Sequence, residues 1–172
     1  MDKKVYELLN EQVKNEFYSA YLYMDFANYY ADESLSGFAN WFMVQAQEER
    51  DHALIFRNYL ILNNCKVELQ AIPQPDKAIK KFIDPLEFSL EHEQKITANI
   101  NAIYEAAFEV RDFRTMQFLD WFIKEQAEEE DIARDMITRM SLFGADANAL
   151  YELNNEFGTR TYVMPSPLAQ AG

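Results

Sequence analysis

The 172-residue chain is strongly acidic, with 29 Asp and Glu residues against 16 Lys and Arg and a formal net charge of −13 at pH 7. Because phosphate binding needs a basic surface and the Lys and Arg residues form no cluster, this composition argues against a nucleic-acid partner. An acidic surface attracts cations, although the same charge can simply keep a protein in solution. The hydrophobic fraction of 49% is sufficient for one continuous core, so residues 1–172 are expected to form a single domain.

The chain contains a single cysteine, Cys65, so an internal disulfide, a CxxC redox motif and a cysteine metal cluster are excluded. The N-terminus leads directly into an amphipathic pattern and has no apolar core of a signal peptide. No apolar run approaches the roughly 18 residues of a membrane span. These features predict a cytoplasmic, soluble protein without a membrane partner.

Apolar residues at helical spacing predict a long amphipathic helix over about residues 3–31. A second helix is expected over about 35–63, with Ser34 as its N-terminal cap. Weak periodicity and two prolines follow, and they indicate a long connection that ends at Asp84-Pro85, a cap and first-turn signal. The later helices are predicted over about 85–110, 113–143 and 146–157, followed by an extended tail over 159–172.

The lengths of the connections predict the topology. Short links make the first and second helices antiparallel, and likewise the third and fourth, whereas the long connection lets the second and third run parallel. Gly144 and Gly158 are placed to end the fourth and fifth helices. The expected fold is all-α: a four-helix bundle with one long crossover and a short fifth C-terminal helix.

Polar residues on the inward stripes repeat between the two helical hairpins with a constant offset of 77 residues. In each half, one residue is followed 33 positions later by a pair at i and i+3, and such a pair shares one helix face. In a bundle with approximate twofold symmetry, these side chains converge at one level. The corresponding residues are Glu16, Glu49 and His52 in the first half and Glu93, Gln126 and Glu129 in the second.

Most helical glutamates lie in solvent, which is the simplest alternative to a buried site. Here the four glutamates of the repeat interrupt apolar stripes; Glu129, for example, is grouped with Phe122, Ile132 and Met136. Burying them without compensation costs several kcal/mol per ion, which a domain with roughly 5–15 kcal/mol of net stability cannot tolerate. Their four negative charges match two divalent cations. Oxygen ligands with one imidazole suit iron or manganese, with zinc as a competitor.

Four segments of the chain resemble the bacterial non-haem ferritins, and the resemblance covers roughly residues 1–160. The matching segments are 10–20 (NEQVKNEFYSA), 46–52 (AQEERDH), 92–94 (HEQ) and 125–130 (EQAEEE). This resemblance implies a ferritin-like bundle with ferroxidase activity, in which O₂ oxidises Fe(II) to Fe(III). It also implies storage of the ferric mineral in a cage of 24 identical subunits, with the fifth helix lining the fourfold axes.

The resemblance implies two iron ions in each subunit, bridged by Glu49, and a third, weaker iron site toward the cavity. The first ion would be held by Glu16, Glu49 and His52. The second would be held by Glu49, Glu93 and Glu129, with Gln126 adjacent. The third site would use Glu48, Glu125, Glu128 and Glu129, and the first two of these also obey the 77-residue offset.

Two aromatic residues match positions near the iron pair in the family. Tyr23 lies two helical turns beyond Glu16, and the resemblance implies a hydrogen bond to an iron ligand or a role in donating an electron. The alternative is an ordinary core tyrosine. Trp121 is interpreted as core packing.

Haem-containing bacterioferritins are related, but they place a haem-ligating methionine at the position after Glu49, where this chain has Arg50. The second paired motif is Gln126-x-x-Glu129 in place of Glu-x-x-His. The resemblance therefore implies iron without haem. The sequence does not identify the reductant that releases stored iron.

Two other functions fit parts of the sequence. A di-iron peroxidase or oxygenase of the rubrerythrin type would use the same ligands, but a lone cysteine cannot build a rubredoxin-type iron site. A Dps-like protective shell would bind DNA and hold iron between subunits, and a basic arm would favour it. This chain has an acidic balance and a complete ligand set of its own.

Overall fold

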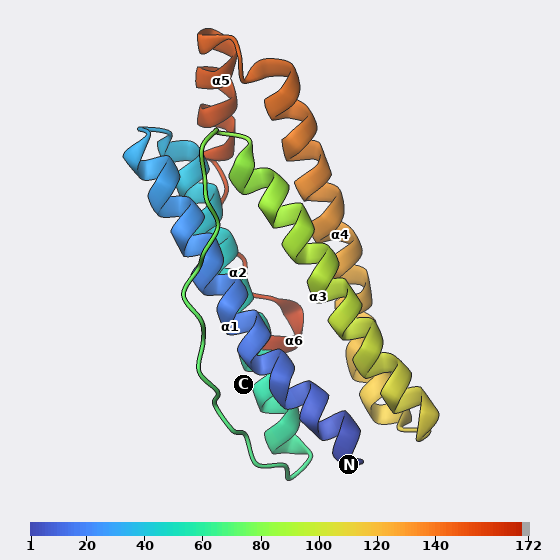
Figure 1. Ribbon diagram of the computed structural model, residues 1–172. Helices are drawn as coiled ribbons and strands as arrows, with labels where there is room; N and C mark the ends of the chain where they lie inside the picture. Colours follow the sequence, from blue (N-terminus) through green and yellow to red (C-terminus); the bar gives the residue numbers. More distant parts are fainter. Residues whose placement is uncertain (170–172) are drawn as a thin grey trace.

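The computed structural model describes residues 1–169, and in this part of the chain every regular element is a helix (Figure 1). The all-α prediction is therefore confirmed. No helix among these residues is long and apolar enough to cross a membrane. The elements are α1 (Lys3–Asp32), α2 (Ser36–Leu62), α3 (Asp84–Glu109), α4 (Phe113–Phe143), α5 (Ala147–Phe157) and α6 (Ser166–Ala169).

Helices α1 and α2 form one antiparallel hairpin, α3 and α4 form another, and the two hairpins pack against each other (Figure 1). The crossover between α2 and α3 runs the length of the bundle along α1, so that α2 and α3 point in the same direction (Figure 1). Asn10 of α1 holds this crossover against the bundle. Its side chain donates to Glu68 O at 2.9 Å and accepts from Glu68 N at 2.8 Å. The expected four-helix bundle with one long crossover is confirmed.

The prediction that Ser34 caps α2 is wrong. Ser34 has a φ of 61° and belongs to the tight turn that ends α1, where its N–H donates to Ala31 O. Leu35 occupies the N-cap position and provides no side-chain hydrogen bond. The first turn of α2 is capped from a distance instead, because Asn154 Oδ1 of α5 accepts from Gly37 N at 2.8 Å and from Phe38 N at 3.3 Å.

The start of α3 also differs from the prediction. Asp84 is the first helical residue, and Ile83 is the N-cap. The Asp84 carboxylate turns back to accept from Lys80 N and Lys81 N at 2.7 and 2.9 Å, so it stabilises the turn that precedes the helix. Pro85 lies in the first turn as expected, where its missing N–H costs no helical hydrogen bond.

The C-terminal part of the chain follows the prediction up to the tail. Gly144 and Gly158 are the C-cap residues of α4 and α5. Up to residue 169 the tail is not extended throughout, because Ser166–Ala169 form the short helix α6, whose last two N–H groups donate to Pro165 O. Residues 170–172 of the predicted tail lie outside the described part of the chain. Pro167 is compatible with this single turn because proline is tolerated in a first helical turn. The tail returns from α5 alongside α2 (Figure 1).

The interior of the bundle consists of two apolar clusters separated by a polar layer. The first cluster includes Val5, Leu9 and Phe56, and the second includes Phe26 and Phe42. One residue of the predicted α4 stripe, Ile132, is 40% exposed, because the buried face of that helix runs one position away, through Glu129, Ala133, Met136 and Met140.

Candidate metal centre

The polar layer holds the residues of the 77-residue repeat, and the bundle brings them to one level. Five ionisable side chains from α1, α2, α3 and α4 lie there at exposures of 1–6%, with a glutamine amide beside them. They are Glu16, Glu49, His52, Glu93, Gln126 and Glu129.

The α1–α2 hairpin forms a compact half of this layer. Glu16, Glu49 and His52 each place one ligand-type atom within 4.8 Å of the other two. His52 Nδ1 lies 3.4 Å from Glu49 Oε2. Among the described residues, Glu16 Oε2 and His52 Nε2 are the buried side-chain atoms that lack a hydrogen-bond partner. Since buried polar atoms are otherwise almost always paired, these two atoms are available to a ligand.

Two glutamines hold the carboxylates of this half in place. Gln12 Nε2 donates to Glu16 Oε1 at 2.7 Å, and Gln45 Nε2 donates to Glu49 Oε1 at 2.9 Å. Each glutamine precedes its glutamate by four residues, so the pair shares one helix face. Gln45 Nε2 also donates to Glu129 Oε2 at 2.9 Å, and it thereby ties the α2 carboxylate to α4.

In the α3–α4 half of the layer, the carboxylates are hydrogen-bonded. Glu93 accepts from the Tyr23 hydroxyl and, at 2.9 Å, from Gln126 Nε2. Glu129 accepts from Gln45. Burial raises the pKa of Tyr23, and the neighbouring Glu93 raises it further, so the phenol keeps its proton and remains a donor.

Burial and crowding set the protonation of the layer without a bound cation. Burial, with the repulsion of Glu49, raises the pKa of Glu16 to about 8 and that of Glu129 to about 7. The same two causes raise the pKa of Glu93 well above its usual range. Burial also opposes ionisation of Glu49, but attraction to His52 outweighs it and lowers the Glu49 pKa. The layer therefore holds protons that a metal would replace.

His52 and Glu49 shift each other's pKa in opposite directions. Burial alone would lower the pKa of its imidazole, but the carboxylate of Glu49, with Glu16 and Glu129, raises it to about 10. Trp121 and Phe122 lie edge-on to the ring at centroid distances of 5.5 and 5.8 Å and orient it. A divalent ion bound at Nε2 would displace one proton and take over its electrostatic role. The set of oxygen atoms and one imidazole fits iron.

The residues predicted for a third site lie beside the layer and are more exposed. Glu125 is half-buried and Glu128 is exposed, whereas Glu129 belongs to the buried layer itself. Glu48 is mostly covered and forms an ion pair with Arg160 of the C-terminal tail. The structure thus gives Glu48 a partner from a segment for which the sequence suggested no role.

Three residues of this region were not predicted from the sequence: Gln12, Gln45 and Arg160. A signal existed for the two glutamines, since both precede a glutamate of the repeat by four residues. The two glutamines do not follow the 77-residue repeat, because the equivalent positions in the second half are Ser89 and Phe122. A search for repeated polar residues therefore passes over them. No comparable signal marks Arg160, which lies outside the helices and depends on the path of the tail.

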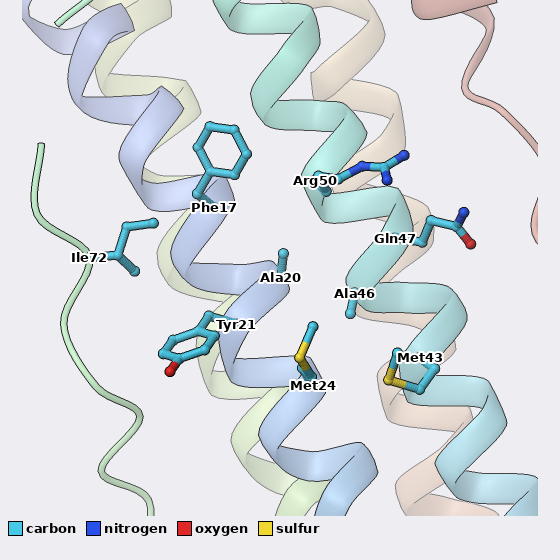
Figure 2. Close-up of a pocket in the computed structure, with 9 residues that line it drawn as sticks. All are labelled: Phe17, Ala20, Tyr21, Met24, Met43, Ala46, Gln47, Arg50 and Ile72. Atoms are coloured by element: carbon cyan, nitrogen blue, oxygen red, sulfur yellow. The ribbon is translucent and has the colours of Figure 1, made fainter. Parts of the chain in front are cut away.

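A groove lies on the solvent-exposed face of α1 and α2 (Figure 2). It has a volume of about 690 Å³ and is mainly apolar. Figure 2 shows Met24 of α1 and Met43 of α2 on its two walls, with Ile72 of the crossover at one side. Its residues include none of the predicted metal ligands, so the groove and the metal centre are separate features.

Comparisons with known proteins agree with this geometry. Residues 6–143 match the family Ferritin, described as a ferritin-like domain. The chain is 36% identical over 162 residues to the bacterial non-heme ferritin of Staphylococcus aureus strain MRSA252, covering 94% of this chain and 98% of the relative. It is 38% identical over 151 residues to the bacterial non-heme ferritin of Campylobacter jejuni, covering 88% and 90%.

Solved structures give the same result. A structure described as an engineered closed form of the Archaeoglobus fulgidus ferritin superposes with a TM-score of 0.92 at 37% identity, covering 95% of this chain and 99% of that one. A structure described as an open pore ferritin from the same archaeon gives 0.91 at 37% identity, covering 94% and 98%. The predicted resemblance is therefore confirmed, and the chain belongs to the ferritin family.

Proposed function

We propose that this chain is an iron-storage ferroxidase that oxidises Fe(II) with O₂ at the polar layer and delivers the ferric product to a cage. The observation that carries the proposal is the buried triad of Glu16, Glu49 and His52, where two polar atoms lack partners. An unpartnered carboxylate oxygen and an unpartnered imidazole nitrogen in a dry layer are costly unless a ligand takes them. Membership of the ferritin family supports iron as that ligand.

The proposed reaction uses two Fe(II) ions as substrate. Glu16, Glu49 and His52 would bind one ion, Glu49, Glu93 and Glu129 would bind the other, and Glu49 would bridge the two. Each Fe(II) loses one electron, and one O₂ accepts both and is reduced to the level of peroxide. The carboxylates neutralise the added charge of Fe(III), and Gln126 and Tyr23 hold Glu93 through the hydrogen bonds that they donate.

The anaerobic addition of Fe(II), followed by O₂, tests this proposal. Ferric absorbance should rise quickly in the wild-type protein and at least about a hundredfold more slowly in Glu49→Ala and Glu129→Ala, because each change removes a ligand. Glu105→Ala on the exposed face of α3 is the matched control. Equal rates in all four proteins would contradict the assignment. Peroxide consumption without a ferric mineral would favour the peroxidase alternative.

We also propose that the subunits assemble into a shell of 24 copies. The outer groove supports burial against another subunit, since Tyr21, Met24 and Met43 on its walls are 41–50% exposed. Contiguous apolar surface of this kind usually marks an interface. Size-exclusion chromatography with light scattering measures the assembly, and a particle of one or two subunits would contradict it.

Further parts of the proposal concern sites and compartment. Glu48, Glu125, Glu128 and Glu129 would form the weaker third iron site, and residues 1–172 would act as one ferritin-like domain. We propose no haem, because the side chain after Glu49 is Arg50, whose guanidinium donates to Asp51 at 2.7 and 3.1 Å. A lone cysteine and an acidic charge balance support a cytoplasmic location without nucleic-acid binding.

A further inference from the structure

Arg160 connects the C-terminal tail to the edge of the polar layer. Its guanidinium lies 4.2 Å from the centre of the Trp41 ring and donates to the backbone oxygen of that residue at 3.5 Å. It also donates to Gln45 Oε1 at 2.8 Å and forms an ion pair with Glu48 Oε2. Only 20% of the arginine side chain is exposed.

This arrangement differs from an ordinary surface ion pair, which contributes little because both partners are solvated and mobile. The tail around Arg160 is fixed on both sides. Asn40 Nδ2 donates to Arg160 O at 2.9 Å, and the Tyr162 hydroxyl donates to the buried carboxylate of Asp51. The guanidinium therefore occupies a defined position on α2.

The contact with Gln45 agrees with the way that amide faces the polar layer. An arginine only donates hydrogen bonds, so the amide must present its oxygen to Arg160. The amide nitrogen then points to Glu49 and Glu129, 2.9 Å from one oxygen of each. Without Arg160, the two carboxylates alone would keep the amide in this orientation, and its oxygen would lose its partner.

The contact with Glu48 supplies a positive charge where a metal ligand is predicted. The guanidinium forms an ion pair with Glu48 Oε2, and both side chains are largely covered, so the positive charge of Arg160 stabilises the ionised carboxylate. Glu125, which is half-buried, repels Glu48 electrostatically. A cation that binds between these two carboxylates would therefore compete with the guanidinium for Glu48.

We propose that Arg160 is a positioning residue that serves as a built-in cation at the third metal site. It holds Glu48 and donates to the amide oxygen of Gln45, so a divalent ion gains full use of Glu48 only after it displaces the guanidinium. The tail thus sets the affinity of the outer site without contacting the buried pair directly. This inference rests on the proposed metal-binding function.

Anaerobic titration with Co(II), which O₂-free buffer keeps from oxidation, tests the inference by calorimetry and visible absorbance. Wild type should bind two ions tightly and a third weakly. Arg160→Ala should strengthen the third binding event by about tenfold or more, because a charge-assisted contact no longer competes for Glu48. Arg160→Lys, which keeps the charge, should remain close to wild type.

Two further variants separate this role from a general effect on folding. Arg139→Ala is the matched control, since Arg139 also pairs with a glutamate, Glu156, and packs over an aromatic ring, that of Phe157. It should leave all Co(II) affinities unchanged. The double variant Arg160→Ala/Glu48→Gln should lose the gain.

An unchanged third affinity in Arg160→Ala, or a gain that persists without Glu48, would overturn the inference and leave the proposed function intact. A wild-type protein that binds no Co(II) at all would instead contradict the proposed function itself.

Discussion

The two halves of the polar layer occupy equivalent positions in the repeat but differ in how their polar atoms are satisfied. In the α1–α2 half, Glu16 and His52 each keep one buried atom without a partner. In the α3–α4 half, Gln126 and Tyr23 hold Glu93, and Gln45 holds Glu129. The same backbone arrangement thus leaves two buried atoms of one half available to a cation, whereas the carboxylates of the other half already accept hydrogen bonds.

The difference indicates that approximate symmetry does not produce equivalent sites. Where one half has His52 the other has Glu129, and where one has Glu49 the other has Gln126. The first exchange moves a positive charge into the α1–α2 half, and the second removes a negative charge from the α3–α4 half. We therefore expect the two metal ions to bind with different affinities.

The largest effect should come from substituting Glu49, compared with substituting Gln126 at the equivalent position of the other half. Glu49→Gln should slow Fe(II) oxidation by about a hundred- to a thousandfold, because both ions lose a shared ligand. Gln126→Ala should slow it less than about tenfold, since Gln126 acts through Glu93. Stopped-flow absorbance measures both rates. Equal losses in the two variants would remove the distinction between the halves.

A second comparison concerns the order of binding. His52→Ala should weaken the first Co(II) ion by about ten- to a hundredfold, and Glu129→Ala should weaken mainly the second. Anaerobic calorimetric titration resolves the two events. If wild type binds two equivalent ions, the proposed difference between the halves is wrong.

The pH dependence of metal binding should report the protons of the layer. A bound cation needs ionised carboxylates and a neutral imidazole, and the pKa values are raised to about 8 for Glu16, about 7 for Glu129 and about 10 for His52. Co(II) affinity should therefore increase between pH 6 and 8, by about tenfold per pH unit for each proton released. Titration in buffers of different ionisation enthalpy counts these protons. An affinity independent of pH would contradict the assigned protonation.

The smallest expected effect is on stability without metal. Because the folded-state pKa of Glu16, about 8, exceeds its usual value of 4.5, the stability that its proton provides is complete below pH 4.5 and is lost as the pH rises through 8. Glu16→Gln should therefore raise Tm by about 2–8 °C at pH 9 and change it little at pH 5. Calorimetry in the presence of a chelator provides the measurement. Glu105→Gln, which is exposed, should have no effect at either pH.

The sequence was sufficient to predict the helices, the crossover and the residues that converge in the layer. These features depend on periodicity and on local signals such as Pro85 and Gly144, which act within a few residues. The repeat identified Glu16 and Glu93 as equivalent residues of the two halves, and approximate symmetry places such residues at one level of the bundle.

Contacts between segments far apart in the sequence could not be predicted from periodicity or from local signals. The Arg160 contacts with Gln45 and Glu48 join residues more than 110 positions apart, and no periodic pattern records the path of the tail. The error at Ser34 has the same origin. A serine before a helix usually caps it, but here the donors of α2 find their acceptor in α5.

The distant cap of α2 has a consequence for the order in which the newly synthesised chain matures. The ribosome releases α1 and α2 long before Asn154, so the N–H groups of Gly37 and Phe38 lack their acceptor while the rest of the chain is being made. A side chain on residue 37 would overlap the backbone oxygen of Asn154, so only glycine leaves room for the arrival of α5. The first hairpin is therefore completed by α5, a helix that is translated only after α3 and α4.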